Sequence, residues 1–177
     1  MAVNRGKQFE DAIESAVMNC KNVSIDRLND PAAGYAGVRN ICDFIVYDYP
    51  YQYYFECKSC YGNTLSIHSN NPKKRYGAIT NNQWEGLLEK APIPGVQAGV
   101  IVWFIDHDIT VYVPIEQLAE LRNNGAKSLN IKDITNGTIA FLTVPGRKKR
   151  VLFEYDARTF LNFLGNMTRT DRRTNNG

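Results

Sequence analysis

The sequence predicts one α/β domain in which helices flank a mixed central β-sheet. Two observations carry this prediction. A helical hydrophobic pattern comes first, a strand meander follows, and helices then lie between further strands. With 177 residues, 44% of them hydrophobic and 22% charged, the chain has the size and apolar content of one globular core. The longest apolar run covers only residues 100–105, and a membrane-spanning helix needs roughly 18 apolar residues, so the sequence excludes one.

The first half of the chain opens with a helix, because Phe9, Ile13 and Ala16 recur at helical spacing. Alternating patterns then indicate strands, and a stretch rich in glycine and alanine indicates a loop. The predicted elements are a helix at 6–20, a strand at 22–28, a loop at 29–40, strands at 41–47 and 52–58, and an irregular segment at 61–79.

The second half alternates between helices and strands. Thr80 is a suitable N-cap for one helix, and Pro114 suits the first position of another. The predicted elements are a helix from Thr80 to Lys90, strands at 98–105 and 109–113, a helix from Pro114 to Arg122, a strand at 138–144, a basic turn at 146–150 and a helix at 156–165. Residues 1–165 therefore form the domain, and the polar, basic residues 166–177 are expected to be a disordered tail.

Basic charge is concentrated at the end of the chain. Residues 1–146 hold 13 basic and 15 acidic residues, whereas residues 147–177 hold 8 basic and 3 acidic ones. This asymmetry suits an anionic partner such as nucleic acid, and it equally suits a solubilising tail. The sequence begins without an apolar leader, and its four cysteines are expected to be free thiols in the cytoplasm. A zinc module around Cys42, Cys57 and Cys60 is an alternative.

The two strands at 41–47 and 52–58 bring three charged residues together. If the turn is centred between residues 49 and 50, Asp43 lies opposite Glu56, and Lys58 points to the same face. The other face is almost wholly apolar and is predicted to be core; it carries Cys42, Phe44, Val46, Tyr53, Phe55 and Cys57. Two opposed carboxylates repel, and Mg²⁺ would compensate them. The alternative is a surface charge cluster that Lys58 neutralises.

These residues resemble the PD-(D/E)xK nuclease superfamily, and within it the RecU-type Holliday junction resolvases. The shared pattern is an acid on one strand, Asp43, and Glu-x-Lys on the next, Glu56-Cys57-Lys58, after a helix that carries another acid, Glu10. Downstream, Ser66-Ile67-His68 and Asn81-Asn82-Gln83 resemble the segment that leads into a helix with a glutamine near its start. The resemblance covers residues 5–165 and implies a restriction-endonuclease-like core.

Two features depart from that pattern. Residues 26–39 are short where RecU-type proteins carry a long stalk, which puts junction specificity in doubt more than the nuclease chemistry. Cys42 stands where the superfamily's name has a proline. Judged locally, Glu10 is also an ordinary acid of a first helical turn.

The resemblance implies Mg²⁺-dependent hydrolysis of DNA, with Mn²⁺ able to substitute. Asp43 and Glu56 would hold the metal, with Glu10 and the Cys57 carbonyl completing its shell. Lys58 would position the attacking water, and Gln83 would contact that water or a phosphate, unless it is a solvated amide. The partners implied are branched DNA and a second copy of the chain, with no membrane, in the host cytoplasm if the source is a phage.

Ten basic residues are candidates for contact with the DNA backbone. They are Arg5, Lys7, Arg39, Lys73, Lys74, Arg75, Arg147, Lys148, Lys149 and Arg150. As solvated charges they would be unremarkable. Two other functions stay open: a nuclease of the same fold that acts on duplex ends or flaps, and a DNA-binding protein of that fold without catalysis.

Overall fold

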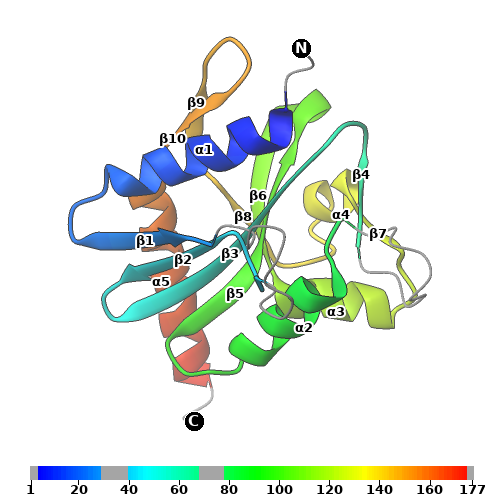
Figure 1. The fold of residues 1–177 in the computed structure, drawn as a ribbon. Helices are drawn as coiled ribbons and strands as arrows, with labels where there is room; N and C mark the ends of the chain where they lie inside the picture. The colour runs from blue at the N-terminus through cyan, green and yellow to red at the C-terminus, as the bar shows by residue number, and fades with distance from the viewer. Residues whose placement is uncertain (1–3, 29–39, 68–77, 175–177) are drawn as a thin grey trace, which may run out of the picture.

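The computed structural model describes residues 4–28, 40–67 and 78–174, with side chains to residue 167 (Figure 1). The predicted loop at 29–40 lies outside the described residues except for Asn40, and most of the irregular segment at 61–79 also lies outside them. In chain order the elements are α1 (Arg5–Met18), β1 (Val23–Arg27), β2 (Phe44–Asp48), β3 (Tyr51–Cys60), β4 (Thr64–Ser66), α2 (Asn81–Lys90), β5 (Val96–Phe104), η1 (Ile105–His107), β6 (Ile109–Pro114), α3 (Ile115–Asn123), β7 (Ser128–Asn130), α4 (Ile131–Thr135), β8 (Leu142–Thr143), β9 (Gly146–Lys148), β10 (Phe153–Tyr155) and α5 (Ala157–Thr174).

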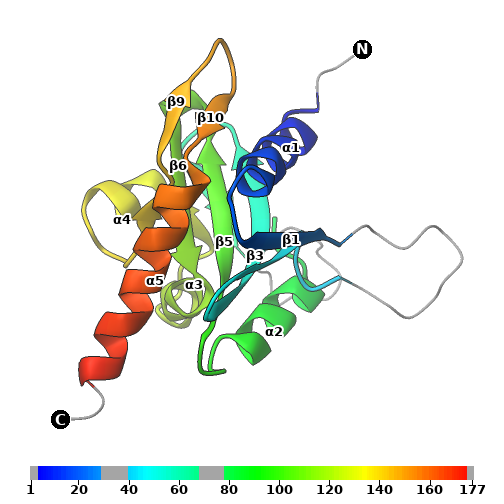
Figure 2. The ribbon, with the colours of Figure 1, turned by 90° about the vertical axis from the view of Figure 1, so that its left-hand side faces the viewer.

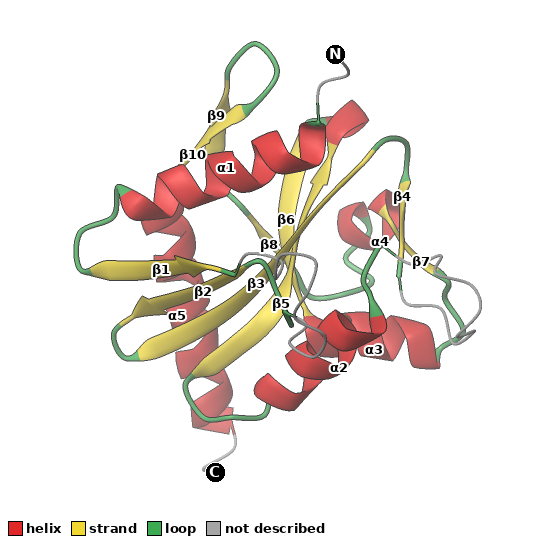
Figure 3. Cartoon of the chain, viewed as in Figure 1, coloured by secondary structure: helices red, strands yellow, loops and turns green. Residues whose placement is uncertain are grey.

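A six-stranded mixed sheet, in the order β1-β2-β3-β5-β6-β8, forms the centre of the molecule (Figure 3). β1, β2 and β3 are an antiparallel meander, whereas β5 is parallel to β3 and antiparallel to β6. A parallel pair needs a crossover connection, and α2 supplies it between β3 and β5. The predicted fold class, an α/β domain with a mixed central sheet flanked by helices, is confirmed.

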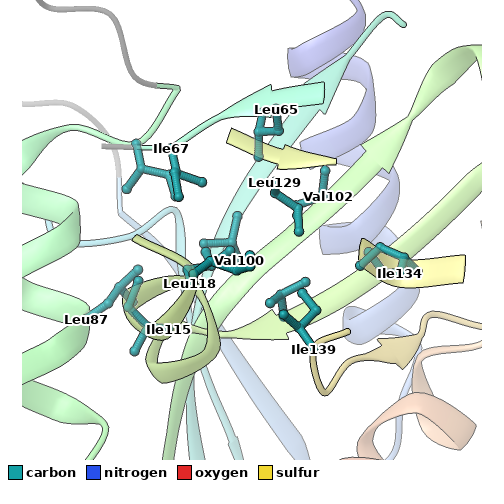
Figure 4. Packing of buried hydrophobic residues seen from close by; sticks show 14 of the residues in the cluster. Leu65, Ile67, Leu87, Val100, Val102, Ile115, Leu118, Leu129, Ile134 and Ile139 are labelled. Carbon is teal, nitrogen blue, oxygen red and sulfur yellow. The ribbon is translucent and has the colours of Figure 1, made fainter. Parts of the chain in front are cut away.

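Each face of the sheet is covered by helices that bury a separate hydrophobic cluster (Figure 2). On one face, Phe9 of α1 and Phe160 of α5 pack against aromatic side chains of the strands. On the other, Leu87 of α2 and Leu118 of α3 pack against Val100 (Figure 4). The sheet is therefore buried on both sides, and a polar side chain on either face must find its partners inside the protein.

The predicted hairpin register is confirmed, since Phe44 pairs with Phe55 and Ile45 with Tyr54. Side chains alternate along β3, so Glu56 and Lys58 share the face towards α2 and α3, while Cys57 belongs to the face towards α1 and α5. Cys42 is buried as predicted, but on the opposite face of the sheet from Phe44: it packs in the cluster beneath α2 and α3. It lies before β2 begins, where strand alternation no longer determines its direction.

Several element boundaries differ from the prediction. The strand expected at 138–144 is reduced to β8, and β4, β7 and α4 were not predicted, because elements of two to five residues carry too short a pattern. Pro114 ends β6 and caps α3 rather than starting the helix. α5 extends to Thr174 rather than residue 165, into the segment expected to be disordered, and Met167 still packs against the core there.

Among the described residues, none of the helices combines the length and the apolar character that crossing a membrane requires.

Candidate active site

Asp43 lies immediately before β2, next to the Phe44–Phe55 pair at which the pairing of β2 with β3 ends. Its backbone N–H donates to the Phe55 carbonyl at 3.1 Å, and its carboxylate Oδ2 accepts from the Cys57 backbone N–H at 2.7 Å. Glu56 stands between these two residues of β3. The two hydrogen bonds therefore hold Asp43 beside Glu56, close to the opposition that the hairpin register predicts.

Glu56 is a carboxylate in the interior of the protein. It lies in β3 beside Val100 of β5 and is 0% exposed. Its Oε1 forms an ion pair with Lys58 Nζ and accepts from Gln83 Nε2 at 2.6 Å, whereas Oε2 has no hydrogen-bond partner among the described residues. The pKa of Glu56 is raised to about 8: burial raises it most, Lys58 opposes that effect, and Asp43 and Glu10 add to it.

Lys58 is the cation of this group and follows Glu56 on the same face of β3. Its side chain is 22% exposed, so it reaches from the buried carboxylate towards solvent. Burial by itself lowers the pKa of Lys58, but Glu56 and Asp43 outweigh that effect, and the net pKa is raised. Lys58 therefore keeps its positive charge at neutral pH.

Gln83 joins the start of α2 to the site. As predicted, Thr80 caps this helix, and its hydroxyl accepts from the Gln83 backbone N–H at 3.3 Å. The Gln83 side chain accepts from the Thr80 N–H at 2.9 Å through Oε1 and donates to Glu56 through Nε2. Gln83 is thus not a solvated amide, and its predicted contact with the attacking water or a phosphate stays a prediction. Gln83 holds the Glu56 carboxylate.

Glu10 reaches the site from α1. Its side chain is 27% exposed, and its Oε2 accepts from Arg27 Nη2 at 2.6 Å. Burial and the nearby Asp43 carboxylate raise the pKa of Glu10, while Arg27 opposes them. Glu10, Asp43, Glu56 and Lys58 all affect one another electrostatically, so the fold brings the four predicted residues into one cluster.

Arg27 was not predicted as part of the site. The sequence does contain a signal for it: strand alternation places Arg27 on the same face of β1 as Val23 and Ile25, which pack towards α1. A charge on an otherwise apolar strand face needs partners, and the first helix offers three carboxylates that meet it.

The donor chemistry of the cluster fits a hard divalent cation, since the available ligands are carboxylate oxygens. The unpartnered, buried Oε2 of Glu56 beside Asp43 is the atom that such an ion would satisfy. As the described side chains are arranged, no group of three His, Cys, Asp or Glu residues could hold a metal ion. Two carboxylates would therefore be the protein's ligands, and the predicted roles of Glu10 and the Cys57 carbonyl remain predictions.

A zinc site built on cysteines finds no support in the structure. Cys42 lies in the cluster beneath α2 and α3, and Cys57 lies in the cluster on the opposite face of the sheet. Burial also raises the pKa of both thiols, which disfavours the thiolate form that zinc requires. The four cysteines are free, as predicted.

The basic candidates that the structure describes lie on α1 and on the β9–β10 hairpin. Arg5 hydrogen-bonds Gln8 at 3.0 Å, and Lys7 is exposed in the same turn of α1. On the hairpin, Arg147 and Lys149 both pair with Glu154, at 2.9 and 3.0 Å, and Lys148 pairs with Asp108. Arg150 is exposed. Arg39, Lys73, Lys74 and Arg75 lie outside the described residues.

Comparison with known proteins finds similarity among solved structures alone. No protein-family model matches the chain, and none of the curated proteins matches it. The Holliday junction resolvase Hjc of Archaeoglobus fulgidus is similar in structure, with 17% sequence identity, over 63% of this chain and 78% of that chain, at a TM-score of 0.44. A likeness this distant carries no functional argument, so a function for this chain has to be argued from the geometry of its site.

Proposed function

We propose that this protein is a metal-dependent endonuclease that hydrolyses phosphodiester bonds in DNA. The observation that supports it best is the state of Glu56. A fully buried carboxylate has one oxygen tied to Lys58 and Gln83 and the other oxygen without a partner among the described residues, beside a second carboxylate, Asp43. Such an arrangement is costly for folding alone, and perturbed carboxylates of this kind are concentrated at catalytic sites.

In this proposal Asp43 and Glu56 hold Mg²⁺, or Mn²⁺ in its place. When bound, the ion polarises the scissile phosphate and lowers the pKa of a water. The ammonium of Lys58, fixed by Glu56, orients the attacking water and stabilises the negative charge that develops on the phosphate. Gln83 keeps Glu56 in place, and Glu10 adds negative charge at the edge of the cluster.

The proposed substrate is a four-way DNA junction, cut on two opposed strands. Paired cuts need two active sites related by symmetry, so the working unit would be a homodimer. The exposed basic residues of the β9–β10 hairpin would contact phosphates without reading sequence. The short segment at residues 26–39 favours a second candidate, a nuclease of the same fold that acts on duplex ends or flaps.

The test is cleavage of a mobile four-way junction and of a matched linear duplex, in Mg²⁺ and in EDTA. Asp43→Asn should lose at least about a hundredfold in rate, because it removes the charge that holds the metal. Its amide oxygen can still accept from the Cys57 N–H, so the fold should be retained. Asp26→Asn, which removes an exposed carboxylate from β1, is the matched control and should cut as the wild type does.

Symmetric, Mg²⁺-dependent cutting of the junction alone would support the resolvase. Cutting of both substrates would support the more general nuclease. If neither substrate is cut, the protein is better explained as a DNA-binding protein without catalysis. Full activity of Asp43→Asn in Mg²⁺ would overturn the assignment of the site.

A further inference from the structure

Arg27, the last residue of β1, forms ion pairs with three carboxylates of α1. Its Nη1 donates to Asp11 Oδ1 at 2.7 Å and to Glu14 Oε2 at 2.8 Å, and its Nη2 donates to Glu10 Oε2 at 2.6 Å. The guanidinium also lies over the ring of Phe44, 5.5 Å from its centroid, and the side chain is 21% exposed.

These contacts divide the guanidinium into two ends. A guanidinium is planar, and its two terminal nitrogens are fixed relative to each other. Asp11 and Glu14 hold the Nη1 end, and the Phe44 ring restricts the plane of the guanidinium. These contacts orient Nη2 without any contribution from Glu10. Of the three acids, Glu10 is the one that meets Nη2, and its charge raises the pKa of Glu56.

The end of β1 also holds the other side of the site. Leu28, the next residue, donates its backbone N–H to the Asp43 carbonyl at 2.8 Å. Two adjacent residues therefore anchor two acids of the cluster, Arg27 through a side chain and Leu28 through the backbone. The placement of Glu10 relative to Asp43 depends on this short stretch of chain.

We infer that Arg27 is a positioning residue: it holds the Glu10 carboxylate beside Asp43, and Asp11 and Glu14 hold Arg27 in the orientation that does so. The inference rests on the proposed function, because it assigns Arg27 to that site. The inference explains why three carboxylates of α1 bind one arginine. A single carboxylate would neutralise Arg27, so packing of the helix on the sheet does not require the other two. It also implies that lysine cannot replace this arginine, since an ammonium has no second end for Glu10.

The first experiment measures binding of Mn²⁺ alone, by electron paramagnetic resonance, without DNA. Arg27→Lys should weaken Mn²⁺ binding several-fold, to about the value of Glu10→Gln. The double variant should be no worse than either single one, because both changes remove the same placement of Glu10. Arg158→Lys is the matched control: that arginine also binds a carboxylate, Asp48, but on α5, and its replacement should leave Mn²⁺ binding unchanged.

The second experiment separates positioning from a structural role. In single-turnover and steady-state cleavage, Arg27→Lys should raise the Mg²⁺ concentration needed for half-maximal rate and leave the KM for DNA unchanged. A purely structural role predicts that Arg27→Lys lowers the melting temperature without changing the Mg²⁺ dependence, and that the effects of Arg27→Lys and Glu10→Gln on Mn²⁺ binding are additive. Either of these two results would overturn the inference. A wild type that neither binds Mn²⁺ nor cuts DNA removes the proposed function. A wild type that does both, matched by Arg27→Lys, removes the inference alone.

Discussion

Glu56 shows how a single side chain can be unfavourable for folding and suitable for chemistry. Its carboxyl group is buried in the sheet, and Lys58, the cation that pairs with it among the described residues, shares Oε1 with Gln83. Burial of a carboxylate costs free energy unless both oxygens are satisfied, and Oε2 is not satisfied by the described residues. The protein therefore carries a group that gains from binding a cation.

The raised pKa of Glu56 makes stability depend on pH. The folded carboxyl has a pKa of about 8 against an ordinary value of 4.5, so between these values the folded state holds a proton that the unfolded state releases. The free energy of unfolding should therefore fall as pH rises from about 4.5 to about 8, without metal. Mg²⁺ binds the ionised form, so the stabilisation it gives should grow over the same range.

Thermal unfolding between pH 5 and 8, with and without Mg²⁺, checks this prediction. Glu56→Gln, which mimics the neutral carboxyl in shape, should remove the effect of Mg²⁺ and most of the pH slope, leaving the smaller part that comes from the raised pKa of Glu10. A variant that keeps the slope would show that another group causes it.

At the scale of elements, the start of α2 performs two tasks at once. Thr80 and Gln83 form a capping box, and the same glutamine holds Glu56. The N-terminus of this helix is thus fixed to the sheet at the site itself. The two tasks can be separated by mutation, because Thr80 takes part in the cap and has no bond to Glu56 among the contacts described.

Thr80→Ala and Gln83→Ala should lower the free energy of unfolding by similar amounts, but only Gln83→Ala should lower the cleavage rate. Each loses part of the cap, at a cost of about 1 kcal/mol. Gln83→Ala also leaves Glu56 Oε1 with Lys58 alone, so its cleavage rate should fall about tenfold, whereas Thr80→Ala should cut normally. Chemical denaturation and single-turnover cleavage give the two values; equal rates would show that Gln83 has no role beyond the cap.

The β9–β10 hairpin projects beyond the end of the sheet in both views (Figures 1 and 2). Its base is rigid, because Tyr155 stacks on Phe153, contacts the ring of Phe9 edge-on at 6.0 Å and hydrogen-bonds Thr110 at 2.9 Å. Phe9 precedes Glu10 in α1. The base of the hairpin, which carries the basic residues, therefore packs directly against the turn of α1 that bears Glu10.

Removing two of these charges should weaken DNA binding in a salt-dependent way. For Lys149→Gln/Arg150→Gln, the slope of log K against log salt should become less steep by about 1.8, as expected when two phosphate contacts are lost. Lys132→Gln, on α4, is the control and should leave the slope unchanged. Titrations of a labelled junction at several salt concentrations measure it. An unchanged slope in the double variant would show that the hairpin does not touch DNA.

At the scale of the whole molecule, the central sheet lies between the two hydrophobic clusters, and β5 and β6 are tightly packed at Gly99. A Cβ added at Gly99 of β5 would lie 2.5 Å from the Val113 carbonyl oxygen and 2.6 Å from the ring of Tyr112. Backbone and a buried ring cannot move aside easily, since each is packed within its own layer. A side chain larger than hydrogen at position 99 would therefore push β5 away from β6 and displace the buried ring of Tyr112.

Gly99→Ala should destabilise the protein by about 1–3 kcal/mol through this overlap. Gly6→Ala is the contrasting change, because a Cβ there meets atoms only at 3.5 Å and beyond, and alanine favours the helix. It should be neutral or stabilising. Urea denaturation of both variants gives the values, and a stable Gly99→Ala would mean that β6 shifts to admit the methyl group.

The sequence by itself determined the features that depend on neighbours along the chain. The register of β2 and β3, and with it the pairing of Glu56 with Lys58, follows from alternation with a period of two. The cap of α2 follows from Thr80 and Gln83, three residues apart. Short elements such as β4, β7 and α4 escaped prediction, because a few residues show no period.

The tertiary structure alone decided the features that depend on how the helices pack against the sheet. Glu10 meets Arg27 across 17 residues, and Gln83 meets Glu56 across 27. The same packing buries Glu56 completely and places Cys42 and Cys57 on opposite faces. Alternation along β1 indicates which way Arg27 points, but no local pattern identifies the partners in these contacts, because the packing of an entire helix against the sheet determines them.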